Sequence, residues 1–186
     1  MLIMSMGVSA DGYITDRNGG IDWGGSSAEQ SLFSLEQVGE LGGYLLGRRL
    51  YEMMLVFETD PAMRETEANA AFADVWTALP KVVFSRTLTA VQGNARLATR
   101  SLDEEAHELA ASGRDVSIGG AELAAQAIRR DLVDEFRLFR HPILLGGGTP
   151  YFPTDVGPFE LELIDTRTFA SRVVYERYRR VRVGPG

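Results

Sequence analysis

Two sequence patterns meet within Asp115-Val-Ser-Ile-Gly-Gly-Ala-Glu-Leu-Ala-Ala-Gln-Ala-Ile128. A short β-branched apolar run ends at Gly119-Gly120 and gives way to an Ala/Leu-rich helical pattern, which predicts a strand, a tight turn and a helix. Glycines let backbone N–H groups approach an anion, and the first helical turn adds unpaired donors. On the pair alone, an ordinary junction that needs left-handed backbone angles is the slightly preferred interpretation, so the rest of the chain must decide.

Length and composition describe an ordinary globular protein. The 186 residues, 45% of them hydrophobic and 24% charged, suffice for one α/β domain and are few for two. We therefore predict a single domain over residues 1–186. The net charge of −7 argues against a nucleic-acid partner. No run of about 18 apolar residues predicts a membrane span, and the absence of cysteine fits a cytoplasmic protein.

Two further strand ends carry arginine. Leu46-Gly47-Arg48-Arg49 places two arginines in the first turn of a predicted helix, where the helix dipole disfavours cations. A bound anion would give them a reason, although a solvated helix face explains them equally well. The apolar run from Lys81, the only lysine, ends in Ser85-Arg86, a hydroxyl beside a guanidinium. Three strand ends are therefore candidates for one anion site.

The remaining periodicity predicts a mostly parallel, helix-flanked sheet with antiparallel strands at its C-terminal end. The alternating run 134–141 predicts a half-buried strand. The alternating runs 159–168 and 171–183 predict an antiparallel pair. Helices are predicted over residues 26–41, 64–79, 101–111 and 121–130, and another begins near Gly47.

Six motifs, taken in order over nearly the whole chain, resemble the dihydrofolate reductase fold, and especially the reductase domain of bacterial riboflavin biosynthesis. They are Ser9-Ala-Asp-Gly-Tyr-Ile14, Gly20-Ile-Asp-Trp23, Leu46-Gly-Arg-Arg-Leu-Tyr-Glu52, Val83-Phe-Ser-Arg86, Ile118-Gly-Gly-Ala-Glu-Leu123 and His141-Pro-Ile-Leu-Leu-Gly-Gly-Gly148. Each motif is weak by itself, and their shared order makes the resemblance fairly specific.

The resemblance implies NADPH as the cofactor. It implies that Gly7 and Ile14 flank the nicotinamide and that Ser85 and Arg86 lie at the adenosine 2′-phosphate. The residues implied at the other phosphates are Gly47, Arg48, Arg49, Gly119, Gly120, Ala121, Glu122 and Leu123. Three departures, at Leu50, Ala121 and Ala124, point away from folate reduction and towards the riboflavin-type branch.

The resemblance also implies a proton donor. Dihydrofolate reductases carry a carboxylate four residues before a phenylalanine on the first helix, and Glu29 and Phe33 have that spacing. Both would lie on one helix face, so Glu29 is predicted to project into a pocket with a raised pKa. An exposed glutamate in a first helical turn would equally need no function. Asp22, next to Trp23 in the preceding loop, is the competing carboxylate.

Predicted substrate contacts lie near the nicotinamide end, and they are Ser5, Met6, Trp23, Phe33 and Arg140. A salt-bridged strand arginine is at least as good an interpretation of Arg140. The loop 16–26 is a candidate lid, and Gly146–Gly148 would border either the site or a subunit interface. Neither His107 nor His141 has a convincing metal partner.

Together these features predict an NADPH-dependent reductase of a small heterocyclic or related molecule, cytoplasmic and homodimeric. One alternative is a non-catalytic ligand-binding protein that has kept the scaffold. The other is a different nucleotide-binding enzyme such as a methyltransferase, which the missing Gly-x-Gly-x-x-Gly run after the first strand disfavours.

Overall fold

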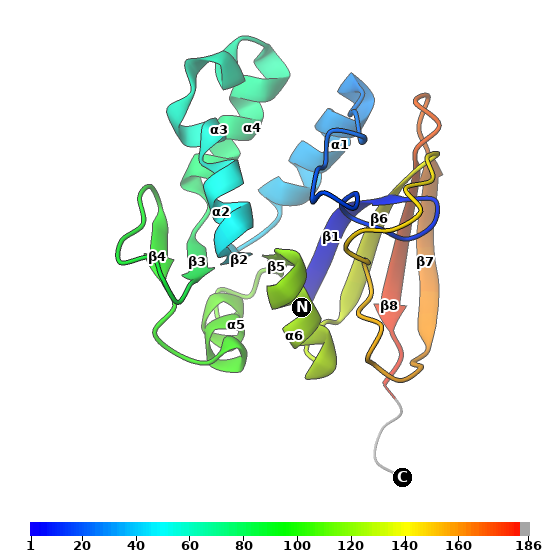
Figure 1. The fold of residues 1–186 in the computed structure, drawn as a ribbon. Helices are drawn as coiled ribbons and strands as arrows, with labels where there is room; N and C mark the ends of the chain where they lie inside the picture. The colour runs from blue at the N-terminus through cyan, green and yellow to red at the C-terminus, as the bar shows by residue number, and fades with distance from the viewer. Residues whose placement is uncertain (183–186) are drawn as a thin grey trace.

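The computed structural model describes residues 1–182 and contains one eight-stranded sheet (Figure 1). Its strands are β1 (Leu2–Ser9), β2 (Gly43–Gly47), β3 (Lys81–Phe84), β4 (Ala95–Leu97), β5 (Val116–Gly119), β6 (Glu135–His141), β7 (Leu161–Thr168) and β8 (Val174–Arg180). In space they follow the order β4-β3-β2-β5-β1-β6-β8-β7. The first six strands pair in parallel, whereas β8 pairs antiparallel with β6 and β7. The predicted mostly parallel sheet with antiparallel C-terminal strands is therefore confirmed.

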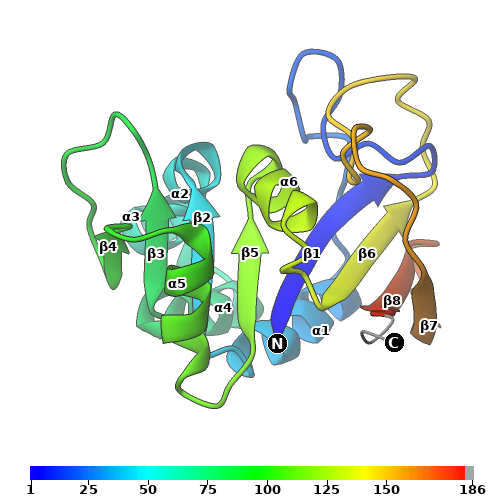
Figure 2. The same cartoon turned by 90° about the horizontal axis from the view of Figure 1, so that it is seen from below.

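Helices cover both faces of this sheet. They are α1 (Ala28–Gly39), α2 (Arg48–Met54), α3 (Val56–Thr59), α4 (Glu67–Ala78), α5 (Leu102–Ala110) and α6 (Ala121–Arg129), with a 3₁₀ turn η1 (Pro61–Arg64). Figure 2 shows α5 and α6 in front of the sheet and α1 and α4 behind it. None of the helices in residues 1–182 has both the length and the apolar character needed to cross a bilayer.

Short polar signals set the helix boundaries. Ser27 and Ser101 each form a capping box, with Gln30 and Glu104 respectively, so α1 and α5 begin close to where the sequence predicts. The helix predicted from residue 64 begins instead at Glu67, because the Thr66 hydroxyl accepts a hydrogen bond from the Asn69 N–H.

Two strand predictions need correction. After the turn at Ser9-Ala-Asp-Gly12, the sequence Tyr13-Ile-Thr15 predicts that a strand could resume, but Tyr13 forms only an isolated bridge with Pro150. The last strand covers Val174–Arg180 and is shorter than the predicted 171–183, whose final residue lies outside the described residues.

Side chains alternate between the two faces along β1 and β6. The Leu2, Met4 and Val8 side chains join the main core, which α5 and α6 cover. The side chains of Ile3 and Ser5, and the open Cα face of Gly7, therefore lie on the α1 side. Parallel register places Ser5 opposite Arg137 and Gly7 opposite Phe139. The α1 face consequently mixes polar and apolar groups close to the centre of the sheet.

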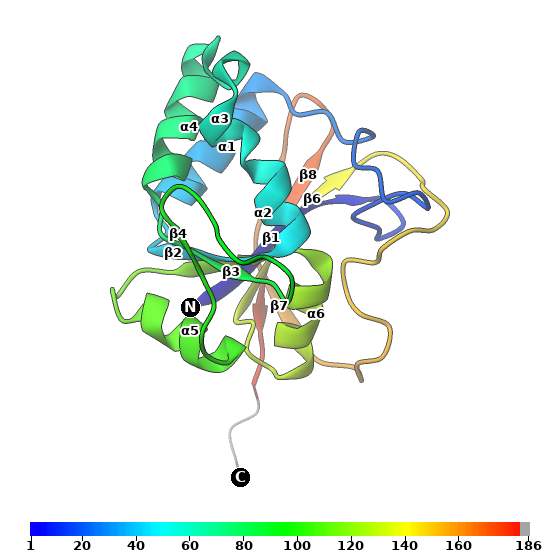
Figure 3. The ribbon, with the colours of Figure 1, turned by 60° about the vertical axis from the view of Figure 1, so that its left-hand side comes forward.

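Two loops lie side by side at the carboxyl ends of β1 and β6 (Figure 3). The loop after β1 bonds to the loop after β6 through the pairs Ala10 N–Ile143 O and Ile14 N–Thr149 O, both 2.8 Å. The Asp11 carboxylate accepts a hydrogen bond from the Gly146 N–H at 2.8 Å. The hydroxyl of Ser9 and these loop N–H groups lower the pKa of Asp11 to about 2. The glycine-rich segment 146–148 therefore anchors the loop that carries the predicted lid.

Candidate active site

The three predicted anion-binding strand ends are neighbours in the structure. Gly47 at the end of β2 pairs with Phe84 at the end of β3, and Leu46 pairs with Gly119 at the end of β5. Carboxyl ends of parallel strands form one edge of a sheet, which is where open α/β sheets bind ligands. The junctions β2–α2, β3–β4 and β5–α6 thus line one continuous edge.

Gly47 and Gly120 make the closest approach at this edge. Gly120 has a φ of +94°, a backbone conformation that other residues rarely adopt. A Cβ atom added there would lie 3.2 Å from both the N and the Cα of Gly47. A Cβ at Gly47 would make only ordinary contacts, the nearest of 3.6 Å to the Cα of Gly120, so Gly120 is the position where this approach requires a glycine.

Helix α6 begins directly after this contact with no side-chain cap. The N–H groups of a first helical turn have no partner within the helix, and they carry the positive end of its dipole. Ala121, Glu122 and Leu123 supply these groups, and the Glu122 side chain points to solvent. Three backbone donors therefore remain available beside Gly47.

The arginines at this edge differ in how they are paired. Arg48 donates to Glu52 at 2.8 Å and to the Thr87 hydroxyl at 2.7 Å, which ties α2 to the turn after β3. Arg49 and Arg86 are exposed and have no hydrogen-bond or ion-pair partner within residues 1–182, a property that only Arg172 shares among the arginines of that range. Two uncompensated guanidinium groups therefore flank the glycine contact.

Ser85 shapes the turn between them. Its hydroxyl accepts hydrogen bonds from the N–H groups of Thr87 at 3.2 Å and Leu88 at 3.0 Å. These bonds fix the backbone that presents the Arg86 side chain to solvent. The same hydroxyl lies 3.5 Å from the hydroxyl of Thr87, and either of the two can donate to the other.

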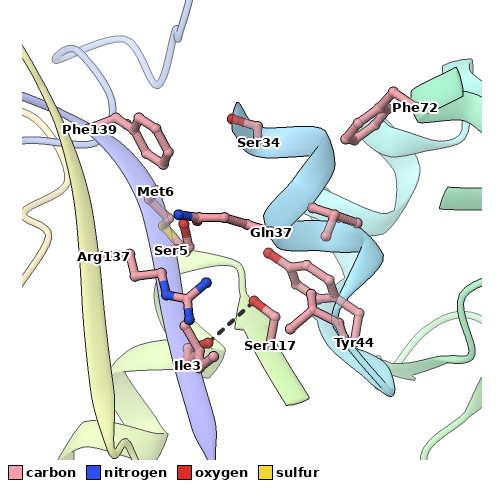
Figure 4. A pocket seen from close by; sticks show the side chains of 13 residues that line it. Ile3, Ser5, Met6, Ser34, Gln37, Tyr44, Phe72, Ser117, Arg137 and Phe139 are labelled. Atoms are coloured by element: carbon pink, nitrogen blue, oxygen red, sulfur yellow. Dashed lines mark hydrogen bonds between the residues drawn. The ribbon is translucent and has the colours of Figure 1, made fainter. Parts of the chain in front are cut away.

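A cavity of about 260 Å³ lies between α1 and the sheet (Figure 4). It is bounded by β1, β6, the start of β2 and Phe72 of α4. Its lining residues are Ile3, Ser5, Met6, Gly7, Ser34, Gln37, Val38, Leu41, Tyr44, Phe72, Ser117, Arg137 and Phe139. Gly7 lies at the carboxyl half of β1, so the cavity reaches the sheet edge that carries the glycine junctions.

The polar groups of the cavity are hydroxyls, an amide and one guanidinium, all of which are able to donate hydrogen bonds. Burial raises the pKa of the Tyr44 phenol, which therefore stays protonated at neutral pH. Gln37 donates from its amide nitrogen to the Tyr175 hydroxyl at 3.0 Å, and Figure 4 shows its side chain crossing the cavity from α1. Arg137 is the charged residue of the lining. A ligand with several acceptor atoms suits such a cavity.

Some of the predicted substrate residues line the cavity, and others do not. Ser5 and Met6 line the cavity. Phe33 lies one layer behind it, with its ring 6.1 Å from that of Phe139. Trp23 lies in the loop before α1, where its ring meets His141 edge-on at 5.6 Å.

Arg140, a predicted substrate contact, does not line the cavity. It is paired in register with Val8, so its side chain points away from the cavity and towards the face that α6 covers. There it binds Glu176 at 2.8 Å. The salt-bridged alternative is therefore the correct one, and Arg137, three residues earlier, faces the cavity instead.

The predicted pocket position of Glu29 is also wrong. Its carboxylate points to the β7–β8 hairpin, where it accepts hydrogen bonds from Arg167 at 2.8 Å and from the Ala170 N–H at 3.2 Å. These contacts lower the pKa of Glu29, the opposite of the predicted rise. Asp22 is exposed in the loop and does not line the cavity.

Replacing Glu29 by glutamine should leave the pH dependence of turnover unchanged, because the carboxylate lies outside the cavity. Its lowered pKa means that its contribution to stability is present above the ordinary value of 4.5 and is lost on acidification. The melting temperature of Glu29→Gln should therefore be lower than that of the wild type at pH 7. The difference between the two melting temperatures should shrink towards pH 3. Thermal unfolding at both pH values measures this difference. A shift of the pH–rate profile in Glu29→Gln would contradict the position of Glu29 outside the cavity.

Several cavity residues are not predicted by the sequence, among them Gln37, Tyr44, Ser117, Arg137 and Phe139. The sequence does contain a feature that could indicate Arg137 and Phe139. Arg137 and Phe139 share one face of a strand that the fold places inside a sheet with helices on both sides. A polar residue on a covered face indicates a cavity or a buried ion pair. The alternation by itself predicts only a half-buried strand.

Comparison with known families agrees with this geometry. The model of the RibD C-terminal domain family matches residues 1–175, which include every glycine junction and cavity residue described above. The chain belongs to the RibD C-terminal domain family. The uncharacterized protein YyaP of Bacillus subtilis (strain 168) is 30% identical over 178 residues, covering 93% of this chain and 91% of YyaP. The chain and this relative thus match over nearly their full lengths.

Solved structures place the RibD C-terminal domain among dihydrofolate reductase-like folds. A Shewanella sp. PV-4 protein described as a riboflavin biosynthesis protein aligns with a TM-score of 0.75 and 27% identity, covering 97% of this chain and 99% of that one. Enterococcus faecalis dihydrofolate reductase, solved in complex with NADP(H), aligns with a TM-score of 0.61 and 17% identity, covering 97% and 96%. The predicted resemblance in fold is therefore confirmed.

Proposed function

We propose that this protein is an NADPH-dependent reductase that transfers a hydride to a small heterocyclic or related substrate bound in the cavity. The observation that carries the proposal is the position of Gly7. It lines the cavity, and it is also the residue that the family resemblance assigns to the nicotinamide. The cavity and the proposed cofactor track therefore meet at one glycine, and the nearest side chain to it is the His141 imidazole, 3.5 Å from the position that a Cβ of residue 7 would take.

The proposed cofactor track fits a phosphate-rich ligand. Arg49 and Arg86 supply positive charge without a protein partner in the described residues, and the α6 N-terminus supplies backbone donors between them. The residues proposed to hold NADPH are Gly7, Ile14, Gly47, Arg48, Arg49, Ser85, Arg86, Gly119, Gly120, Ala121, Glu122 and Leu123. Arg86 would meet the 2′-phosphate, which distinguishes NADPH from NADH.

The bound cofactor supplies the hydride. The chain's own part is to orient the substrate and to exclude water. Phe139 and Met6 bound the cavity near Gly7, and Phe33 supports Phe139 from behind. Since Glu29 lies outside the cavity, and burial raises the pKa of the Tyr44 phenol and makes it a weaker acid, we propose that water provides any proton.

Stereospecific transfer from deuterated NADPH tests the proposal. NADPH carrying deuterium on one face of the nicotinamide is incubated with pterins, aminopyrimidines and small carbonyl compounds, and mass spectrometry follows the label. The proposal predicts that one of the two labelled forms delivers deuterium to a product. NADPH binding without oxidation across this panel would instead support the second candidate, a non-catalytic ligand-binding protein, which the position of Glu29 outside the cavity favours. Assembly as a homodimer stays a prediction, which analytical ultracentrifugation would test.

A further inference from the structure

Arg137 is the most unusual side chain of the cavity. Its side chain is only 8% exposed, yet it lies at the cavity wall. Its Nε donates to the Glu135 carboxylate at 2.7 Å. Its two terminal nitrogens have no hydrogen-bond partner among residues 1–182. Figure 4 shows them pointing across the cavity towards Tyr44 and Ser117.

The charge of Arg137 is only partly balanced by neighbouring carboxylates. Glu135 is fully buried, and Arg177 already holds it through two hydrogen bonds of 2.8 Å each. Two guanidinium groups thus share one carboxylate, and Arg177 takes most of it. The next carboxylate in register is Asp165, which is exposed on the edge strand and lies opposite Arg177, away from the cavity. A buried charge without full compensation is costly, so such a group usually has a ligand.

The neighbours of Arg137 also favour an anion with acceptor oxygens. The Tyr44 phenol is held protonated by burial and can donate. The Ser5 hydroxyl lies opposite Arg137 in the register of β1 and β6. The Ser117 hydroxyl gives its proton to the Ile3 carbonyl at 3.3 Å, so it is not counted among the donors to an anion. The two terminal guanidinium nitrogens form a fork that matches the two oxygens of a carboxylate.

We infer that Arg137 binds a carboxylate of the substrate at the inner end of the cavity. This inference rests on the proposed function, because it names the substrate class of that same site. Ser5, opposite Arg137, is two residues from Gly7, which corresponds to about 7 Å along a strand. The substrate is therefore a small molecule whose carboxylate is separated from the carbon that accepts the hydride. Arg137 acts in recognition of this group and takes no part in the chemical step.

Matched pairs of small planar molecules test the inference without turnover. The probes are orotate and uracil, pterin-6-carboxylate and pterin, and benzoate and benzamide, each titrated by calorimetry. The wild type should bind at least one carboxylate about 10- to 100-fold more tightly than its neutral partner, the range expected for a charge-assisted bidentate contact. Arg137→Met should abolish that preference, and Arg137→Lys should restore part of it.

Arg140→Gln is the matched control, because Arg140 lies on the same strand but faces the opposite side. It should keep the preference for the carboxylate. Arg137→Met leaves Glu135 paired with Arg177, so its folding can be checked by thermal unfolding. The inference is wrong if no carboxylate is preferred by the wild type, if the preference survives in Arg137→Met, or if Arg140→Gln loses it equally.

NADPH titration of the same samples separates this inference from the proposed function. Absence of any Arg137-dependent carboxylate preference, with NADPH binding intact, would overturn only the role of Arg137. A carboxylate preference that depends on Arg137, in a protein that binds no NADPH, would overturn the reductase and leave the anion site in place.

Discussion

Gly120→Ala is expected to weaken NADPH binding by about 10- to 100-fold, the effect of losing one or two backbone contacts to a charged group. The added Cβ would lie 3.2 Å from the backbone of Gly47, closer than such contacts normally occur. Neither partner is a flexible side chain, so the β2–α2 and β5–α6 junctions must move apart. The backbone donors of both would then leave the positions that suit one chain of phosphates. Calorimetric titration with NADPH measures the effect.

Gly113→Ala is the matched control for this variant. Gly113 has a comparable φ of +75°, but no atom lies within 4 Å of the position that a Cβ would take. Gly113→Ala should cost about 1–2 kcal/mol of backbone strain, and Gly120→Ala at least as much, because its ψ of 119° lies outside the left-handed helical region. Only Gly120→Ala should lose NADPH affinity. Equal affinities of the two variants would show that the contact between Gly47 and Gly120 is structural and unrelated to cofactor binding.

The second large effect on NADPH binding is expected from replacing Arg49 and Arg86, whose side chains have no partner within residues 1–182. The double variant Arg49→Gln and Arg86→Gln is expected to lower NADPH affinity by about 100-fold, because each charged contact to phosphate contributes on the order of 1–2 kcal/mol. The folded protein should be barely affected, since neither side chain has a partner to lose in the described residues. Binding should also become less sensitive to salt.

Arg172→Gln provides the control for charge alone. Arg172 is exposed and has no hydrogen-bond or ion-pair partner for its side chain within residues 1–182, but it lies in the β7–β8 hairpin, far along the sheet from β2 and β3. The variant changes net charge by one unit and should keep wild-type affinity. If Arg172→Gln weakens binding as much as Arg86→Gln alone, long-range charge and not a phosphate contact would explain the loss.

The strand ends could be predicted because their signals are local. At Ile118-Gly-Gly-Ala121, the apolar run, the glycine pair and the helical pattern lie within a few residues of one another. The same holds for Leu46-Gly47 and for the capping box at Ser27. Parallel pairing then brings the strand ends together, since strands that run the same way share one edge.

The cavity could not be predicted in the same way, because it depends on contacts between distant segments. The spacing of Glu29 and Phe33 correctly places both on adjacent turns of α1. The direction of Glu29 is decided by Arg167, 138 residues later in the chain. Arg137 and Arg140 have similar local patterns, and only the register with β1 shows which of them faces the cavity.

Titration of the wild type with NADPH and NADH under identical salt conditions tests most directly whether the glycine junctions and their unpaired arginines hold NADPH. We predict saturable binding of NADPH, with NADH at least about 10-fold weaker because it lacks the phosphate proposed to meet Arg86. Failure of both nucleotides to bind would contradict the proposed cofactor site. Equal affinities would remove the role of Arg86 at the 2′-phosphate.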